Sequence, residues 1–554
     1  MKKYTYIIIL ALVVLVAVVL RFYKLGEIPK GLYVDEAGQG YSAYSIVTTG
    51  KDEFGMKFPI VFRSMTDFRT PVYTYLISPL IPIFGLNNFS VRFPSFLLGV
   101  LSVYMLFLLV NKITENKQIS LISAFLLAIS PWHIMFSRTA FETNVSLFFL
   151  LCGLYFFYKA VEKPIFLLVS AISFSISIVA YQSERLIVPL ILVVLFLRYK
   201  NILLSKTHKN FMLISLLAGF IVLLPTISIM FTPGFWARAA GLNIFSHSKH
   251  LPDGYIEGYK GIFSFVVNSS WFLSSREFLW HYFSYFSPRY MFVVGDYEPR
   301  LSFPGLSTFF IWQFPFYIYG LWLLFKENKF GPIKFVTILL LLVSPISAAI
   351  TRDPYSTLRA FPLQIPQLII ISFAIYQMFI SIKRSALRYS FVILFLLIIS
   401  HTFFKLYSSG IILNDHYRAR YWHWGWQEVV NQLSVIDPNS KVVVDNARGD
   451  VYLQLAFYLK YDPTKYQNEN FEVPLSEYYT NMYHTSEKHI GNITTKPIDW
   501  KNDTKVEQYL VGDELGISLE QIKNHNLSLI AEIKYPDGSI AYRITKTNPT
   551  SNSK

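Results

Sequence analysis

Two adjacent carboxylates near the N-terminus are the first residues whose types and spacing could do chemistry. Asp35 and Glu36 follow the first apolar segment, after a Pro-Lys-Gly-Leu turn at 29–32 and before a helical run at 37–48. We expect them at a helix N-terminus, where the helix dipole stabilises ionised carboxylates. A carboxylate held there could be catalytic, but Asp and Glu are also common in the first turns of ordinary helices. Taken alone, the pair favours the ordinary helix start.

Arginines on the same predicted side of the chain change that balance. The charged residues expected there, besides the acidic pair, are Arg69, Arg92, Arg138, Glu142, Arg352, Asp353 and Arg359. Guanidinium groups bind anions through paired hydrogen bonds, so the set suits an anionic group held beside a catalytic carboxylate. For Arg92 and Arg138 singly, a side chain that extends from a helix end to lipid headgroups is an equal alternative.

Two further residues are candidates for substrate binding. His133 follows Pro131-Trp132 at the outer end of a predicted span, where an interface aromatic with a satisfied imidazole is favoured over acceptor binding. Asp296 lies in a large loop near Arg289 and Arg300. A structural ion pair and the binding of an acceptor or sugar hydroxyl are equally good interpretations of Asp296.

The composition indicates the element type that must position these residues. The chain has 554 residues, of which 53% are hydrophobic and only 15% charged. A soluble chain normally carries about 25% charged residues, so we expect a polytopic membrane protein. The one cysteine, Cys152, excludes an intramolecular disulfide framework and a Cys-rich metal site. No phosphate-binding Walker loop, dinucleotide fingerprint or HExxH motif is present.

Apolar segments long enough to cross a hydrocarbon layer of ~30 Å recur through the first three quarters of the chain. We predict about eleven transmembrane helices, at 5–22, 92–111, 119–136, 144–161, 164–181, 185–199, 211–231, 306–325, 334–350, 360–381 and 389–406. The segment 70–90 is apolar but broken by Pro79 and Pro82, and we expect it to be re-entrant or surface-lying. With that assignment, lysine and arginine gather in the loops on the side of the N-terminus, which predicts a cytoplasmic N-terminus.

The same assignment predicts two domains. Residues 1–406 form the transmembrane domain, with extracytoplasmic loops at 23–91 and 232–305, and residues 407–554 form an extracytoplasmic soluble α/β domain. In the tail, 441–446 is expected to be a buried strand, and 451–459 a helix or strand against it.

Two more tail segments have a readable pattern. The stretch 528–547 alternates around Asp537-Gly538 and predicts a hairpin. The aromatic and basic stretch 416–430 is either a membrane-surface helix or an amphipathic helix docked on the domain.

Six stretches carry a resemblance to a known family. They are GLYVDEAGQGYSAYSIVTTGKDEFG at 31–55, RTPVYTYL at 69–76, FGLNNFSVRFPS at 84–95, SPWHIMFSRTAFETN at 130–144, FSPRYMFVVGDYEPR at 286–300 and SPISAAITRDPYSTLRAFP at 344–362. The chain resembles polyprenyl-phosphate-dependent glycosyltransferases of the membrane-embedded GT-C superfold. The nearest branch is glycosyltransferase family 39, with the protein O-mannosyltransferases and the aminoarabinose transferases of lipid A. The resemblance covers about residues 1–405.

The resemblance implies an all-α polytopic membrane protein of GT-C-like fold, to which the sequence adds a C-terminal extracytoplasmic α/β domain. It also implies an inverting transfer of one sugar from a lipid phosphate to an extracytoplasmic lipid, glycan or protein. In the family, the residue at the position of Asp35 is the general base, which makes Glu36 an orienting or acceptor-binding neighbour. Arg69 and Arg92 match positions near the donor phosphate, whose negative charge grows in the transition state.

Further site residues complete this expectation. We assign Arg138 and Arg359 to the donor phosphate as well, and Glu142, His133 and Asp296 to substrate binding. No cofactor is required by these motifs, although Asp35, Glu36 and Glu142 leave a divalent metal open. The partners expected are a polyprenyl-phosphate-linked sugar, an extracytoplasmic acceptor and the lipid bilayer, with no nucleic acid, in a multi-pass protein of the plasma membrane.

Departures from the family narrow the substrate. Many relatives carry lysine where this chain has Arg69. The histidine-proline-proline signature of eukaryotic protein O-mannosyltransferases is absent, which puts a mannose donor and a protein acceptor in doubt. The Trp-Trp-Asp motif of N-oligosaccharyltransferases is absent too, so we do not expect transfer of a whole oligosaccharide.

The alternative is a transporter or flippase of a lipid-linked or anionic solute. Such a protein should show two similar halves and charged residues near mid-span. Here the spans are nearly free of charge at their centres, and the charges gather at the outer rim. A receptor or scaffold would leave the acidic pair and the arginines without a role. The sequence therefore favours an enzyme, a glycosyltransferase that uses a lipid-phosphate sugar.

Overall fold

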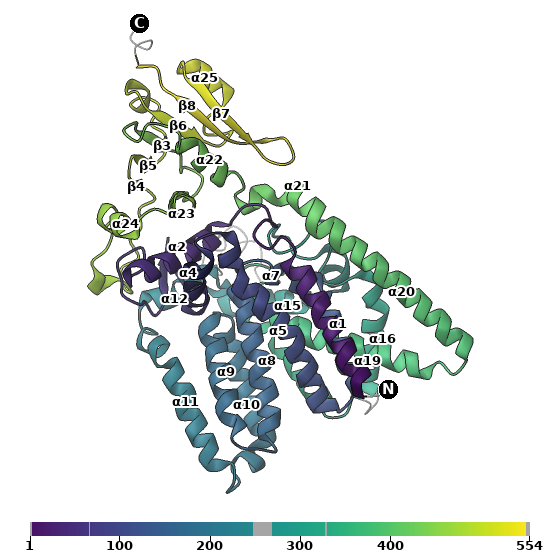
Figure 1. Cartoon of the computed structure of the whole chain (residues 1–554). Coiled ribbons are helices and arrows are strands. Elements are labelled where there is room, and N and C mark those ends of the chain that lie inside the picture. Colours follow the sequence, from purple (N-terminus) through teal and green to yellow (C-terminus); the bar gives the residue numbers. More distant parts are fainter. Residues whose placement is uncertain (1–2, 66, 248–268, 327–329, 550–554) are drawn as a thin grey trace, which may run out of the picture. The chain divides into compact units, whose positions relative to one another are not determined.

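The computed structural model describes the chain except residues 1–2, 66, 248–268, 327–329 and 550–554 (Figure 1). The chain divides into two compact units. The helical unit comprises Met1–Tyr23, Ser95–Met230 and Trp236–Ser409, and the mixed unit comprises Lys24–Pro94, Phe231–Phe235 and Gly410–Lys554. The predicted domain boundary at 406/407 stays a prediction.

The helical unit consists mainly of long apolar helices, with a few short helices and longer connections between them. Its helices are α1 (Lys3–Phe22), α6 (Lys117–Ala128), α7 (Pro131–Ser137), α8 (Glu142–Ala160), α9 (Phe166–Ala180), α10 (Glu184–Leu203), α11 (Lys209–Ser228), α13 (Ile244–His247), α15 (Ser270–Ser284), α16 (Phe314–Lys326), α17 (Ile333–Val343), α18 (Ile346–Ala349), α19 (Gln364–Ser381) and α20 (Ser385–Tyr407). Helix α9 packs against α8, α10 and α11, and α19 packs against α6, α16 and α17. Helices α5 (Asn88–Thr114) and α12 (Pro233–Leu242) begin in the mixed unit and end in the helical unit.

The lengths of these helices bear directly on the predicted spans. Seven helices in the described part of the chain are long and apolar enough to cross a membrane, and the bent pair α6–α7 can be counted as an eighth. This confirms the polytopic, mostly helical class, while the count of eleven stays a prediction. The helices α9 and α17–α18 are apolar but shorter. The predicted span 306–325 becomes an α-helix only at Phe314.

The predicted span 119–136 is not a single straight helix. It bends by 60° between α6 and α7. Pro131 lacks a backbone N–H and opens α7, and the Ser130 hydroxyl accepts a hydrogen bond from the His133 N–H at 3.3 Å. A proline and a cap therefore end one helix and start the next inside a continuous apolar run.

The segment 70–90 is also broken, as its prolines predict. Proline stands at the first or second position of α3 (Pro71–Ile77), η1 (Ser78–Leu80) and α4 (Ile81–Phe84). From Pro71 to Phe84 such a segment covers about 20 Å, less than the ~30 Å of a hydrocarbon layer. This length favours the non-spanning interpretation.

The mixed unit contains a six-stranded sheet of order β4-β5-β3-β6-β8-β7. Its strands are β3 (Val442–Val444), β4 (Lys488–Ile490), β5 (Ile493–Thr495), β6 (Tyr509–Gly512), β7 (Ser528–Lys534) and β8 (Ile540–Lys546). The central strand β3 is parallel to both β5 and β6, and its three residues are buried. A small core of Val443, Leu510, Ile517 and Leu527 packs with it. The predicted strand at 441–446 and the hairpin at 528–547 are both confirmed, with Gly538 at φ +85° in the turn.

Helices and a short hairpin complete the mixed unit. They are α2 (Val34–Thr49), the hairpin β1 (Phe62–Ser64) and β2 (Asp67–Arg69), α21 (Asn414–Arg418), η9 (Ala419–Trp422), α22 (Trp426–Leu433), α23 (Tyr452–Tyr458), α24 (Pro463–Glu469) and α25 (Leu519–Asn524). Of the two options for 451–459, the helix is the observed one.

The stretch 416–430 is not one helix. It changes direction at His423 and Gly425, which have φ of +54° and +105°. Helix α22 then buries Trp426, Val429 and Val430, and the Trp426 ring lies 4.6 Å from that of Tyr542 in β8. The docked amphipathic helix is therefore the correct alternative for residues 426–433.

Candidate active site

The acidic pair lies in the first turn of α2, as predicted. The Glu36 carboxylate accepts a hydrogen bond from the Tyr33 N–H at 3.2 Å, and Gly50 ends the helix in the left-handed conformation at φ +72°. Asp35 is half-buried, and its carboxylate makes no hydrogen bond or ion pair with the described part of the chain. The two neighbouring acids therefore differ, since one is engaged and the other is available.

Glu36 is fixed by Arg92. The Arg92 Nε and Nη2 groups donate to the two Glu36 carboxylate oxygens at 3.1 and 3.0 Å, and both side chains are buried. Arg92 also donates to the carbonyl oxygens of Pro29 and Gly31, at 2.9 and 2.7 Å. Such a bidentate pair is geometrically specific, so it joins the start of α2 to the turn before it and to α5.

The Arg69 side chain also contacts the first turns of α2. Its Nη1 group donates to the Asp35 backbone carbonyl at 3.2 Å, and its Nη2 group lies 3.3 Å from both the Ser42 hydroxyl and the Glu53 carboxylate. A Cβ at Gly38 would lie 2.2 Å from Arg69 Nη1, so this crossing requires glycine at that position. The Arg69 Nε–H has no hydrogen-bond partner among the described residues.

A second acidic pair, Asp52 and Glu53, follows α2 and is not among the predicted site residues. The Asp52 carboxylate accepts hydrogen bonds from the backbone N–H groups of Phe54 and Met56 and from the Tyr478 hydroxyl, at 3.1, 2.8 and 2.5 Å. Burial, together with the neighbouring Glu53, raises the pKa of Asp52 to about 8. The pKa of Glu53 is also raised by burial, against the pull of Arg69. The signal in the sequence was the Asp-Glu dipeptide itself, which repeats the pattern of residues 35–36.

Two predicted site residues lie close together in the helical unit. His133 is fully buried, accepts a hydrogen bond at Nδ1 from Arg21 at 2.8 Å and stacks on Phe361 with ring centres 5.7 Å apart. Arg138 donates to the carbonyl oxygens of Leu20 and Tyr23 at 3.0 and 2.7 Å. These carbonyls belong to the last turn of α1 and the residue after it, so Arg138 caps that helix end and does not extend toward headgroups.

Asp296 is held by hydrogen bonds. Its carboxylate accepts from the Thr357 N–H and hydroxyl, both at 2.7 Å, and from the Glu298 N–H at 2.9 Å. Burial raises its pKa. Arg300, a predicted ion-pair partner of Asp296, is bound by Glu298 at 2.9 Å. The contacts to Thr357 tie the second loop to the segment between α18 and α19.

The last two predicted site residues, Arg359 and Glu142, are partly exposed. Arg359 pairs with Asp353 and donates to the Thr351 hydroxyl at 3.1 Å. Glu142 lies in the first turn of α8 and is half-buried. The predicted residues thus form a group at the α2 N-terminus, consisting of Asp35, Glu36, Arg69 and Arg92, while the others belong to the helical unit.

Of the residues suggested as metal ligands, Asp35 and Glu36 belong to the mixed unit and Glu142 to the helical unit. Within the described residues, no group of three or more His, Cys, Asp or Glu side chains could hold a metal ion. Both Glu36 oxygens are already bound by Arg92. We therefore derive no step through a metal.

Comparison with known proteins agrees with the sequence resemblance. Residues 68–229 match the family model described as dolichyl-phosphate-mannose-protein mannosyltransferase. A curated relative, an uncharacterized protein of Aquifex aeolicus strain VF5, is 27% identical over 38% of this chain and 42% of its own length. The match thus spans less than half of that relative.

Solved structures establish the fold. ArnT from Cupriavidus metallidurans matches over 98% of both chains with 12% identity and a TM-score of 0.52. Its complex with undecaprenyl phosphate matches over 99% of this chain and 98% of its own, at 12% identity, with a TM-score of 0.51. An oligosaccharyltransferase of Archaeoglobus fulgidus, tethered to an acceptor peptide, matches over 98% of this chain and 74% of its own at 13% identity, with a TM-score of 0.52. The chain has an ArnT-like fold, and the resemblance to membrane-embedded GT-C glycosyltransferases is confirmed.

Proposed function

We propose that this protein is an integral-membrane inverting glycosyltransferase that moves a single sugar from a polyprenyl-phosphate donor to an extracytoplasmic acceptor. Support comes from the fold, from the family match at residues 68–229 and from the arrangement at the start of α2. The structure of ArnT with undecaprenyl phosphate supports a lipid-phosphate donor for this chain.

The observation that carries the proposal is the contrast between Asp35 and Glu36. Glu36 gives both oxygens to Arg92, whereas the half-buried Asp35 carboxylate has no partner in the described chain. A general base must reach the proton that it removes, and it must be held in place. Asp35 meets both requirements, because it is accessible and its helix is fixed by two buried arginines.

In the proposed reaction, an acceptor hydroxyl or amine attacks the anomeric carbon of the donor sugar. Asp35 takes the proton that the attacking atom loses, while the bond between the anomeric carbon and the phosphate oxygen breaks. The electron pair of that bond stays on the polyprenyl phosphate, whose negative charge increases. Groups that bind this growing charge lower the barrier more than they strengthen substrate binding.

Arg69 is the arginine best suited to that charge. Its Nε–H is buried and has no partner in the described chain, and its Nη1 group donates to the Asp35 carbonyl oxygen at 3.2 Å, so one arginine would contact the phosphate and hold the base. Arg92 would act mainly as a positioning residue through Glu36. The phosphate role of Arg138 and Arg359 and the substrate-binding role of Glu142, His133 and Asp296, all in the helical unit, stay predictions.

The proposal is tested with purified protein and a cell-envelope extract from cells that lack the gene, which supplies the lipid-phosphate donor together with lipid, glycan and protein acceptors. Asp35→Asn should reduce product formation at least about a hundredfold, because general-base catalysis contributes that much or more. Asp437→Asn, an exposed aspartate of the mixed unit, is the matched control and should retain activity. Transfer by Asp35→Asn at the rate of the control would remove Asp35 as the base.

A further inference from the structure

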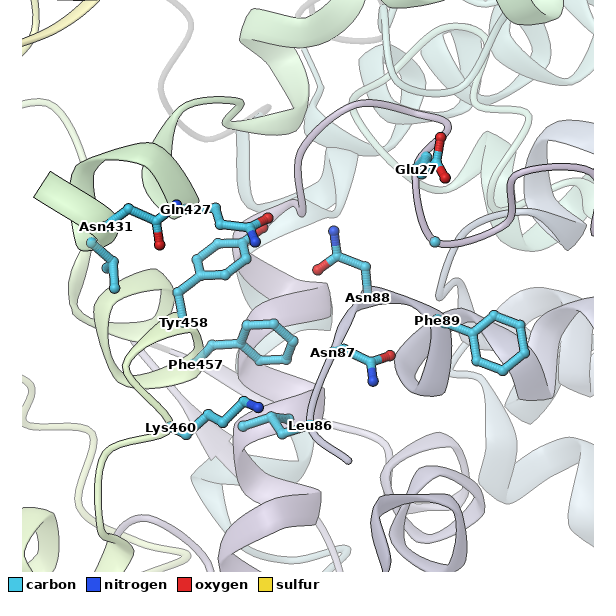
Figure 2. Close-up of a pocket in the computed structure, with 12 residues that line it drawn as sticks. Glu27, Leu86, Asn87, Asn88, Phe89, Gln427, Asn431, Phe457, Tyr458 and Lys460 are labelled. Atoms are coloured by element: carbon cyan, nitrogen blue, oxygen red, sulfur yellow. The ribbon is translucent and has the colours of Figure 1, made fainter. Parts of the chain in front are cut away.

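A pocket within the mixed unit is not used by the proposed chemistry. It has a volume of about 380 Å³, within the range of small-ligand sites. Its walls come from both ends of the first loop and the start of α5, and from α22 and the end of α23. Figure 2 shows Gln427, Phe457 and Tyr458 on one wall facing Asn87 and Asn88 on the other.

The polar groups of the pocket are mainly carboxamides. Asn87, Asn88, Gln427 and Asn431 all line it, together with Tyr458. The Asn87 carboxamide donates to the Phe84 carbonyl at 2.6 Å and accepts from the Ser90 N–H at 3.0 Å, so Asn88, Gln427 and Asn431 are the carboxamides offered to a ligand. A carboxamide both donates and accepts hydrogen bonds, as a hydroxyl group does, so a cluster of them matches a ligand rich in hydroxyl groups. An isolated anion or cation would instead be expected to recruit opposite charges.

The charged groups of the pocket do not favour a charged ligand. Its one cation, Lys460, and its one anion, Glu27, are of opposite sign, and both residues are exposed. Exposed charges are screened by water and salt. The remaining walls, including Phe457 and Phe89, are apolar and suit the C–H faces of a sugar ring.

The elements that carry these side chains are held firmly. Gln427 and Asn431 are four residues apart on α22, so they share one face of that helix. Phe457 is buried at the end of α23. Asn88 is hydrogen-bonded to Tyr458 and begins α5, and Arg92, one turn further along α5, binds Glu36. The pocket is therefore built on the same helix as the arginine that fixes the acidic pair.

We propose that this pocket binds an uncharged, hydroxyl-rich sugar unit of the acceptor. That the bound sugar belongs to the acceptor rests on the proposed function. That the ligand is a sugar rests on the carboxamide cluster alone. A sugar bound there would hold the acceptor against α5 and α22 while another part of it reacts.

The test uses the full-length protein in detergent on a printed array of uncharged and acidic oligosaccharides. The wild type should retain uncharged oligosaccharides, and the double variant Gln427→Ala/Asn431→Ala should lose about tenfold in affinity or more, because each lost hydrogen bond weakens binding several-fold. Gln432→Ala is the matched control, since Gln432 is an exposed residue of the same helix outside the pocket lining. It should bind as the wild type does.

Three results would each overturn the sugar site. They are binding of acidic oligosaccharides only, the absence of binding, and equal binding by the double variant and the wild type. The transfer assay keeps this test apart from that of the proposed function. If transfer depends on Asp35 but is unaffected by the double variant, the sugar site is rejected and the proposed glycosyltransferase stands. Pocket-dependent sugar binding without any transfer would keep the sugar site and reject the glycosyltransferase.

Discussion

At the scale of single residues, neighbours in sequence can have opposite roles. Asp35 and Glu36 share one helical turn, yet only Glu36 forms a buried bidentate pair with Arg92. A buried charge that loses its partner costs far more than the pair itself contributes, because the remaining charge is no longer compensated. The two residues should therefore respond differently to the removal of their charge.

We expect Glu36→Gln to lower the free energy of unfolding by about 3 kcal/mol, since Arg92 would stay buried without a counter-charge. Asp35→Asn should change it little. Glu487→Gln, at an exposed position, is the control. The measurement is the fraction of protein that stays monodisperse after heating in detergent. Equal thermal stability of Glu36→Gln and Glu487→Gln would contradict the proposed role of the pair.

Gly38 offers a second test at the same scale. Gly38→Ala places a Cβ 2.2 Å from Arg69 Nη1, and the buried arginine must move. Overpacking of this kind typically costs about 1–3 kcal/mol. Gly241→Ala in α12 meets nothing within 4 Å and should be neutral or slightly stabilising. Heating experiments in which both alanine variants behave alike would argue against the crossing of Arg69 over α2.

At the scale of elements, the turn after α2 is tied to the tail by the buried Asp52. A raised pKa means that the folded protein keeps a proton that the unfolded chain releases above about pH 4. Stability due to this group is therefore full below about pH 4, falls as the pH rises toward 8, the pKa of Asp52 in the fold, and then levels off.

Asp52→Asn should remove this dependence, because the amide does not ionise and can still accept the hydrogen bond from Tyr478. The stability of the variant relative to the wild type should therefore rise between pH 5 and 8. Unfolding temperatures measured across that range, with Asp437→Asn as the control, test the expectation. Parallel curves for the wild type and Asp52→Asn would show that Asp52 is ionised in the folded protein.

Local sequence patterns predict helices and strands well, but they predict poorly which side chains contact one another. The strand at 442–444 and the hairpin with Gly538 could be predicted, because apolar runs and turn residues act over a few positions. The apolar run at 119–136 concealed the bend at Pro131, since hydropathy does not distinguish one helix from two. The ion pair of Arg69 with Glu53 depends on the passage of the Arg69 side chain across α2 at Gly38, which no local pattern encodes.

At the scale of the whole molecule, the chain divides into two compact units, and each is built from several separate segments of the chain. The first loop, Lys24–Pro94, belongs to the same unit as the tail from Gly410. Such a unit, built from segments far apart in the chain, cannot be read from sequence order. We propose that this mixed unit lies outside the cytoplasm and that the N-terminus lies inside.

Single cysteines test this orientation, because the native Cys152 is buried. Asn439→Cys, at an exposed position of the mixed unit, should react with a membrane-impermeant maleimide in intact cells. Gln118→Cys, at the exposed start of α6, should react only after permeabilisation. The reverse pattern would invert the proposed topology.

The most direct test of the central claim is mass spectrometry of lipid-phosphate sugars and glycoconjugates from cells in which the gene is deleted. These cells are complemented with the wild type, Asp35→Asn or Asp437→Asn. Deletion should accumulate one lipid-phosphate sugar and remove that sugar from one acceptor. The wild type and Asp437→Asn should reverse both changes, and Asp35→Asn should reverse neither. Full complementation by Asp35→Asn would contradict the account, as would unchanged lipid-phosphate sugars and glycoconjugates in the deletion strain.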